Sequence, residues 1–320
     1  MQPWPLQPRL FFVIGRHESS GTLSSETSVS QPMPPPVPAR RAIVSGALLM
    51  IGATLCFVLL DSILKVLSRT HDVLFLVWGR NGFQLAYLIL LMPLLGARRM
   101  ITTRHPVVHV FRGVLLITTT LSIVFALKTI PLAQAYSIGF SAPLIATVLA
   151  AIFLRERPSL QRWVLIIIGF VGVLVALQPG APNAGAHLIF PLMLAISNGA
   201  FHVLSRSIAQ EEDPLAMNFF VALTATLISS LSLPWTWSTM RLDEWGMLAL
   251  ASVFGTLAHL MLALAFRLAP TAVVSPMIYF QIVSASAVGY LAFGEVPTTA
   301  TLLGAVIVIV SGIALIRSKT

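Results

Sequence analysis

The sequence predicts an all-α polytopic membrane protein with ten transmembrane helices, arranged as two inverted repeats of five helices. Three observations predict this class: the composition, a series of apolar runs and an internal repeat. Of the 320 residues, 57% are hydrophobic and 10% are charged, and the mean hydropathy is +0.89. A soluble domain has roughly 45–50% apolar and about 25% charged residues. The composition therefore places most of the chain in a bilayer and argues against a soluble enzyme or a nucleic-acid-binding domain.

Ten apolar runs follow residue 41, and each is long enough to cross about 30 Å of hydrocarbon. They cover about 42–64, 73–95, 107–127, 131–154, 160–178, 187–207, 214–234, 245–266, 270–293 and 298–316. The connections are too short to hold a catalytic domain. Residues 1–40 are polar and rich in proline, so we expect a disordered tail. The predicted organisation is this tail, a first repeat over 41–180 and a second repeat over 181–320.

Lysine and arginine are unequally divided between the two sets of loops. With a cytoplasmic N-terminus, 14 of the 20 basic residues fall on the cytoplasmic side, 4 fall on the outer side and 2 lie within spans. The positive-inside rule therefore predicts that both termini are cytoplasmic and that the number of spans is even. The same bias accounts for the formal net charge of +9 without a nucleic-acid partner.

The second half of the sequence repeats the first. A shift of 139 residues places 126–158 on 265–297 without a gap, and a shift of 141 places Asp61 and Lys65 on His202 and Arg206. The repeat unit contains five spans, an odd number, so the second copy must be inverted in the membrane. Inverted repeats are typical of secondary transporters, whose substrate site lies near the midplane where the halves meet.

Several short motifs at the ends of these spans identify a resemblance. In the first copy they are Ala126-Leu127-Lys128, Pro143 and Phe153-Leu154-Arg155-Glu156-Arg157-Pro158, together with Arg80 in the second span. In the second copy they are Ala265-Phe266-Arg267, Ser275-Pro276, Phe293-Gly294-Glu295-Val296-Pro297 and Gly304. Over about 42–317 the chain resembles the drug/metabolite transporter superfamily, in its EamA-type branch. The resemblance implies a carrier that moves a small metabolite across the bacterial inner membrane by alternating access.

Two further stretches resemble one subgroup of that branch. They are Leu60-Asp61-Ser62-Ile63-Leu64-Lys65 and the segment from Pro276-Met277-Ile278-Tyr279-Phe280-Gln281 to Glu295. Both are similar to bacterial riboflavin transporters and S-adenosylmethionine uptake proteins. The expected substrate is riboflavin or a related flavin, with S-adenosylmethionine second and export of an amino acid or other metabolite third. The bilayer is the expected partner, and a homodimer is the further assembly considered.

Charged side chains within the spans are the first candidates for the site. Arg80 lies about eight residues into its span, with Gln84 one turn further along, and a charge there is costly unless it faces the protein interior. It would anchor a polar or anionic substrate group, or else form a structural ion pair. Asp61 is the acid inside a span, and Lys65 lies at i+4 on the same helical face. The favoured interpretation is a salt bridge between them, and the alternative is proton coupling through Asp61.

Polar residues on three other spans complete the candidates. Asn198, His202 and Arg206 share one stripe of the sixth span and are interpreted as a water-lined wall. Tyr136 and Ser141 lie in the fourth span, and Tyr279 and Gln281 lie in the ninth. Aromatic and small polar groups on two repeat-related helices suit a flat heteroaromatic ligand. The alternative is helix packing through small residues.

Sequence motifs for other chemistry are missing. The chain has no G-x-x-x-x-G-K-[ST] motif, H-E-x-x-H motif, G-x-S-x-G motif or cluster with metal-ligand spacing. We therefore predict no catalytic residue, no metal and no cofactor. The rival classes are a membrane-embedded enzyme, which would need acids, histidines or cysteines clustered at one membrane depth, and a passive channel.

Overall fold

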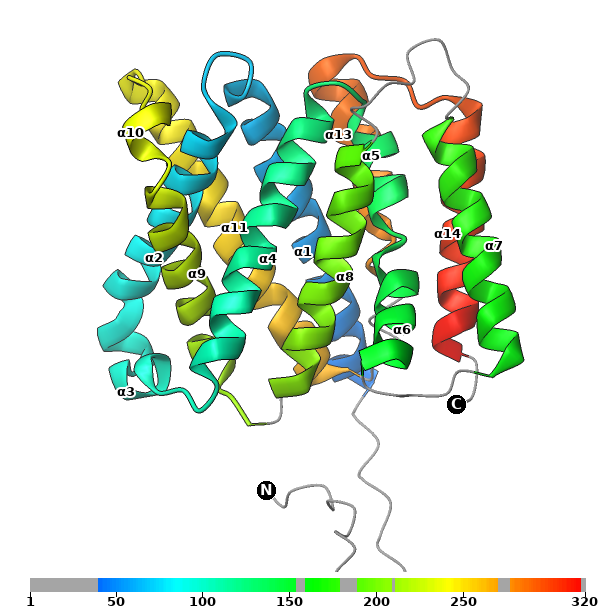
Figure 1. Cartoon of the computed structure of the whole chain (residues 1–320), viewed down its shortest axis with the longest axis horizontal. Coiled ribbons are helices and arrows are strands. Elements are labelled where there is room, and N and C mark those ends of the chain that lie inside the picture. The colour runs from blue at the N-terminus through cyan, green and yellow to red at the C-terminus, as the bar shows by residue number, and fades with distance from the viewer. Residues whose placement is uncertain (1–39, 154–158, 179–188, 209–210, 270–276, 318–320) are drawn as a thin grey trace, which may run out of the picture. The chain divides into compact units, whose positions relative to one another are not determined.

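The structure, a computed structural model, describes residues 40–153, 159–178, 189–208, 211–269 and 277–317, and these residues form helices and no strand. The predicted tail lies outside the described residues except for Arg40. The helices of the first half are α1 (Arg40–Leu67), α2 (Val73–Leu95), α3 (Ala97–Ile101), α4 (Pro106–Leu127), α5 (Leu132–Gly139), α6 (Ala142–Phe153) and α7 (Leu160–Leu177). Those of the second half are α8 (Ile189–Ile208), α9 (Pro214–Ser230), α10 (Leu233–Thr236), α11 (Leu242–Leu268), α13 (Phe280–Phe293) and α14 (Thr299–Arg317) (Figure 1).

Four of the described helices are long and apolar enough to cross a membrane. They are Arg41–Leu67, Val73–Leu95, Pro106–Leu127 and Leu242–Leu262. Five more are apolar but shorter, namely Leu160–Ala176, Ile189–Ser205, Pro214–Ser230, Phe280–Phe293 and Thr299–Leu315. The chain is therefore a multi-pass helical membrane protein. Its described helices overlap the apolar runs that the sequence shows, except the short helix α3, which lies between two of them.

The fourth predicted span, 131–154, is not one continuous helix. It is divided into α5 and α6 by a turn at Phe140 and Ser141. The Ser141 hydroxyl donates to Ile138 O at 2.8 Å, and its N–H bonds to the same carbonyl at 3.0 Å. Pro143 has no backbone N–H with which to continue the ladder, so a helix is expected to break one turn before it. Discontinuous helices of this kind border the substrate sites of many transporters.

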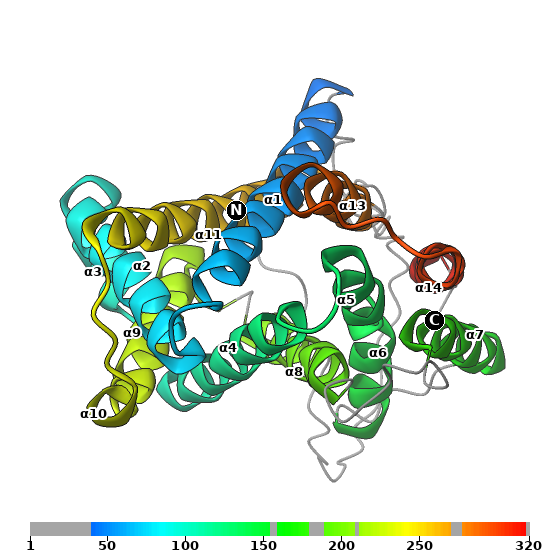
Figure 2. The same ribbon diagram turned by 90° about the horizontal axis from the view of Figure 1, so that it is seen from above.

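Helices of the two halves pack in corresponding pairs. α1 packs against α11, and α8, which corresponds to α1, packs against α4, which corresponds to α11. In the same way α1 contacts α13 while α8 contacts α6, and α2 contacts α11 while α9 contacts α4. Helices α2 and α9 pack together, and α7 stands beside α14 at one side of the bundle (Figure 2).

Glycines bring α7 and α14 into close contact. A Cβ on Gly304 would lie 2.6 Å from both Gly172 O and Ala176 N, so no larger residue fits at position 304 without moving α7. Small residues at membrane helix interfaces allow this close backbone approach. The pair therefore forms a tightly packed unit that contacts α5.

Candidate functional site

Asp61 and Tyr136 join α1 to α5. The Tyr136 hydroxyl donates a hydrogen bond to Asp61 Oδ2, and both side chains are buried. The predicted salt bridge between Asp61 and Lys65 is wrong. The two residues do share a helical face, but a hydroxyl on a neighbouring helix meets the carboxylate, and Lys65 finds an acid elsewhere.

Lys65 forms an ion pair with Glu295, which follows α13 in the second half of the chain. The other oxygen of Glu295 accepts the N–H of Leu132 at 3.0 Å, at the first residue of α5. The Lys65 ammonium also lies 5.0 Å from the centre of the Phe293 ring. Glu295 therefore ties α1 and α5 of the first half to the end of α13, one helical turn beyond Asp61 on α1. We call this end of the bundle the Lys65 end.

Arg80 enters the same region from α2 and is 3% exposed. Its Nη1 donates to Thr120 Oγ1 on α4 at 3.2 Å and to Asn81 Oδ1 at 3.3 Å. The guanidinium also lies against α11, because a Cβ on Gly255 would be only 3.4 Å from Arg80 Nη2. Asp61 is close enough to attract it electrostatically. We call Asp61, Arg80, Thr120, Tyr136 and Gln281 the central cluster.

Gln281 brings the second half into this cluster. It lies in the first turn of α13, and its side chain interacts with the Tyr136 hydroxyl. Gln84, one turn after Arg80 on α2, is 3% exposed, and its Oε1 has no hydrogen-bond partner among the described residues. The structure thus brings together four of the predicted site residues: Arg80, Tyr136, Gln281 and Asp61. Gln84, also predicted, lies one turn after Arg80 on α2.

Three aromatic rings extend from the cluster. The ring centroid of Phe140 lies 6.4 Å from that of Tyr136 and 5.4 Å from that of Tyr279. The 139-residue shift pairs Phe140 with Tyr279, and the structure places these two rings in contact. The Tyr279 hydroxyl is buried with no partner among the described residues and lies against Gly312 of α14. Ser141 is buried, and its hydroxyl donates to the main-chain carbonyl of Ile138, as described above.

The stripe predicted on α8 is separate from the central cluster. Asn198 is half-buried, and His202 is exposed with its ring 6.1 Å from that of Phe201. Within the described part of the chain, neither forms a hydrogen bond to the central cluster. The side chain of Arg206 lies outside the described residues. The stripe's role in a pathway stays a prediction.

A second buried charged cluster lies at the opposite end of the bundle, beside α3. Arg112 of α4 donates to Ser205 Oγ of α8 at 3.0 Å and to Met217 O of α9 at 3.3 Å, and its guanidinium lies over the Phe201 ring. Its Nη1 also contacts His109 Nδ1 at 3.1 Å. Arg112 is not among the site residues predicted from the sequence, although an arginine within an apolar span and three residues after a histidine was a usable signal.

Glu212 completes this second cluster from the loop before α9. Its Oε1 accepts hydrogen bonds from the Thr103 hydroxyl at 2.8 Å and the Arg104 N–H at 2.7 Å, and Oε2 lies 3.8 Å from His109 Nε2. A loop glutamate is normally exposed, so nothing in the sequence indicated its burial. We call Glu212, His109 and Arg112 the α3-end cluster.

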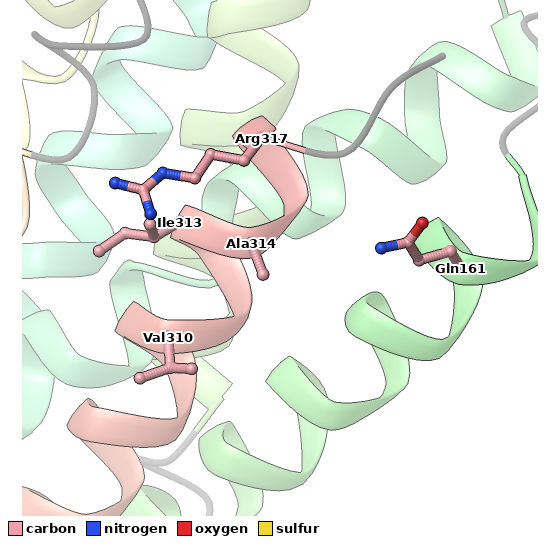
Figure 3. A pocket seen from close by; sticks show the side chains of 5 residues that line it. All are labelled: Gln161, Val310, Ile313, Ala314 and Arg317. Carbon is pink, nitrogen blue, oxygen red and sulfur yellow. The ribbon is translucent and has the colours of Figure 1, made fainter.

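A shallow cavity of about 420 Å³ lies away from both clusters. Gln161 of α7 faces Val310, Ile313, Ala314 and Arg317 of α14 across it (Figure 3). Among the described residues, no group of three or more His, Cys, Asp or Glu side chains is placed to hold a metal ion.

A multi-pass bundle with an acid, a base and aromatic rings buried between its halves belongs to the class of polytopic membrane transporters. The chain belongs to the EamA-like transporter family, whose model matches it twice, over residues 44–178 and 185–318. Family membership indicates a transporter rather than an enzyme. A solved protein structure with 18% sequence identity and a TM-score of 0.61, covering 86% of this chain and 97% of its own, has the same fold.

Several curated relatives are similar over most of their length. An S-adenosylmethionine uptake transporter of Rickettsia bellii is 30% identical over 264 residues, 79% of this chain and 91% of the relative. A pseudopaline exporter of Pseudomonas aeruginosa is 27% identical and covers 86% of this chain and 97% of its own. A riboflavin transporter of Vibrio cholerae is 25% identical, with coverages of 84% and 91%.

Proposed function

We propose that this protein is a secondary transporter of ten transmembrane helices in the bacterial inner membrane. Its two inverted repeats cover 41–180 and 181–320 and alternate between opening to one side and to the other. The paired packing of corresponding helices supports this proposal, because α1 against α11 and α8 against α4 are the same contact with the halves exchanged. Helix α1 begins and α14 ends at the same edge of the bundle (Figure 1), as an even number of spans requires.

The orientation proposed for the bundle places both termini in the cytoplasm. The excess of lysine and arginine in the loops on that side supports it. The α3 end would then face the cytoplasm and the Lys65 end would face outward. A reporter fused after Thr320 that is active only outside the cell would contradict this orientation.

The observation that carries the functional proposal is the central cluster. Asp61 and Arg80 are buried charges inside the bundle. Asp61 accepts from Tyr136 and Arg80 donates to Thr120, both of the first half, while Ser252 of α11 in the second half donates to the main-chain oxygen of Arg80. Buried ionisable groups in membrane proteins are costly and usually mark a substrate or ion pathway. We assign substrate contact to Arg80, Gln84, Tyr136, Tyr279 and Gln281, and a wall of the pathway to Asn198, His202 and Arg206.

Two substrates have separate support. S-adenosylmethionine is supported by the 30% identity to the Rickettsia uptake transporter. Riboflavin, the substrate expected from the sequence, is supported by the Vibrio relative and by the three contacting rings, which suit a flat heteroaromatic compound. Because the former relative is more similar, S-adenosylmethionine is the first compound to test.

Uptake into proteoliposomes containing the full chain tests the proposal. Radiolabelled S-adenosylmethionine and riboflavin are supplied separately, with the other compound and amino acids as competitors. A carrier gives saturable uptake and exchange of internal for external substrate. Flux that neither saturates nor exchanges would indicate a passive channel, and no flux of any compound would contradict transport of this substrate class.

A further inference from the structure

The two buried charges of the central cluster, Asp61 and Arg80, lie near each other, but they form no ion pair with each other in the described part of the chain. Asp61 Oδ2 is occupied by the Tyr136 hydroxyl, whereas Arg80 Nη1 donates to two neutral oxygens, of Asn81 and Thr120. The planar guanidinium suits a carboxylate held through two parallel hydrogen bonds, and Arg80 has no such partner in the described part of the chain.

Hydrogen-bonding capacity is left unused around the same residues. Arg80 Nε and Gln84 Oε1 are buried and have no hydrogen-bond partner among the described residues. The two side chains lie at i and i+4 on one face of α2. An unpaired buried polar atom costs about 1–3 kcal/mol, so each of these two atoms needs a partner beyond the described residues. A guanidinium nitrogen and an amide oxygen without partners among the described residues lie one turn apart on α2, and a buried carboxylate attracts the guanidinium; these are groups that suit a charged, hydrogen-bonding ligand.

From this geometry, and resting on the proposed transport function, we propose that the central cluster binds the α-amino-acid group of its substrate. Arg80 takes the substrate carboxylate through its guanidinium. Asp61 takes the ammonium through Oδ1, the oxygen that does not bond to Tyr136, while Tyr136 holds the carboxylate of Asp61 in place. Gln84 Oε1 accepts a further N–H of the ligand. A zwitterionic group carries both charges that the site complements, so neither protein charge is left unpaired in the bound state.

This inference separates the two candidate substrates. S-adenosylmethionine carries an α-ammonium and an α-carboxylate at one end of the molecule, together with an adenine ring that the Tyr136–Phe140–Tyr279 rings could stack. Riboflavin is uncharged at neutral pH and would leave Arg80 and Asp61 without ionic partners. The site therefore takes amino-acid-bearing metabolites in preference to flavins.

Equilibrium binding to the full chain in lipid nanodiscs tests the assignment with four compounds. S-adenosylmethionine has the amino-acid group and a sulfonium, S-adenosylhomocysteine keeps only the amino-acid group, 5′-methylthioadenosine has neither, and riboflavin is the competing class. In the wild type we expect the first two compounds to bind at least about tenfold more tightly than 5′-methylthioadenosine. Riboflavin should bind no more tightly than 5′-methylthioadenosine.

Variants of the two charged residues assign the contacts. In Arg80→Gln and in Asp61→Asn the advantage of S-adenosylhomocysteine over 5′-methylthioadenosine should fall to about twofold or less. The ratio of the two affinities is taken within each variant, so a partly unfolded sample does not alter it. Arg241→Gln is the matched control, because Arg241 is exposed and pairs with Asp243.

Three outcomes separate this inference from the proposed function. The amino-acid site would be overturned if neither variant lowered the ratio of the affinities for S-adenosylhomocysteine and 5′-methylthioadenosine. The same conclusion would follow if the wild type bound these two compounds equally tightly. Tight binding and uptake of riboflavin with no binding of the other compounds would also overturn it, while the transport proposal stands. The expected ratios without uptake of any bound compound would support the site and overturn the transport proposal.

Discussion

Arg80 and Arg112 are buried arginines in apolar helices of the same half of the chain, and they are partnered very differently. Arg80 is 3% exposed and Arg112 is 4% exposed. Arg112 donates to a hydroxyl and a main-chain carbonyl, contacts His109, lies over the Phe201 ring and is attracted by Glu212. Arg80 donates from one nitrogen to two neutral oxygens and keeps Nε without a partner among the described residues.

Because the two arginines are almost equally buried, burial alone does not identify a residue that binds a ligand. A buried charge whose hydrogen bonds are satisfied by its own chain stabilises the fold, and its removal leaves other buried groups unpaired. A buried charge with unused hydrogen-bonding capacity is available to a ligand. We therefore expect Arg112 to stabilise the fold and Arg80 to contact the substrate.

The largest effect is expected for Arg112→Ala. Its removal leaves the Glu212 carboxylate with less compensating charge and takes a donor from Met217 O, so the free energy of unfolding should fall by about 3–5 kcal/mol. Unfolding of the purified variant in detergent, together with its level in the membrane, measures this loss. Arg112→Lys is the control, because it keeps the charge but loses the planar fork. An Arg112→Ala variant of normal stability that fails to transport would reverse the assignment.

The ion pair between Lys65 and Glu295 should give the next largest effect. Glu295→Gln or Lys65→Met leaves one charge of a largely buried pair unmatched, and each should lower the free energy of unfolding by about 1–3 kcal/mol. The double variant removes both charges and should cost less than the sum of the two single variants. If the losses in the free energy of unfolding of the two single variants add up to that of the double variant, the ion pair contributes no coupling between the two halves.

Arg80→Ala should affect transport while the protein remains folded. The uptake rate should fall at least about tenfold, equivalent to about 1.4 kcal/mol, because a ligand contact is lost. Membrane levels should hold, since removal of a buried charge lowers the cost of inserting α2. Arg80→Lys should restore little if paired hydrogen bonds matter. Normal uptake by Arg80→Ala would remove Arg80 from the site and direct attention to Asn198, His202 and Arg206.

The smallest effect expected is a pH dependence of stability from the α3-end cluster. Burial alone would raise the pKa of Glu212, but hydrogen bonds from the Arg104 N–H and the Thr103 hydroxyl outweigh it, and the pKa lies below its ordinary value of 4.5. A carboxyl with a lowered pKa in the folded state stabilises the fold above its unfolded pKa. That stability is lost as the pH falls through the folded-state pKa.

Comparing Glu212→Gln with the wild type measures this contribution. The melting temperature of the wild type should exceed that of the variant at pH 7, and the gap should narrow from about pH 5 downward as Glu212 becomes protonated. A difference in melting temperature between wild type and Glu212→Gln that is the same at pH 7 and below about pH 5 would show that the charge of Glu212 does not stabilise the fold.

The break in the fourth predicted span is a feature that its hydropathy does not predict. Its apolar length correctly predicts the helical structure of 132–139 and 142–153, but the hydropathy pattern contains no sign of the turn at Phe140 and Ser141. Pro143 was available as a local signal, since a proline removes the hydrogen bond to the residue four positions earlier. Whether such a proline bends or breaks a helix depends on the neighbouring helices that satisfy the freed backbone groups.

By itself, the sequence determined the class of protein and most of its helical segments, and it indicated a transporter family by resemblance. The reason is that the bilayer requires long apolar helices, and their length and composition are properties of contiguous residues. The sequence also singled out Arg80 and Asp61, because charges in apolar runs are visible without a structure. The contact between Phe140 and Tyr279 agrees with the register of the internal repeat.

Only the tertiary structure decided which groups the charged residues meet. Spacing placed Lys65 on the same face as Asp61, but Glu295 lies 230 residues further along the chain and forms the ion pair with Lys65. Tyr136 from α5 then provides the hydrogen bond to Asp61. Sequence spacing describes neighbours on one helix, whereas a buried charge in a bundle pairs with whichever polar group another helix brings to the same depth. The partners of Asp61, Lys65, Arg80 and Arg112 therefore follow from helix packing.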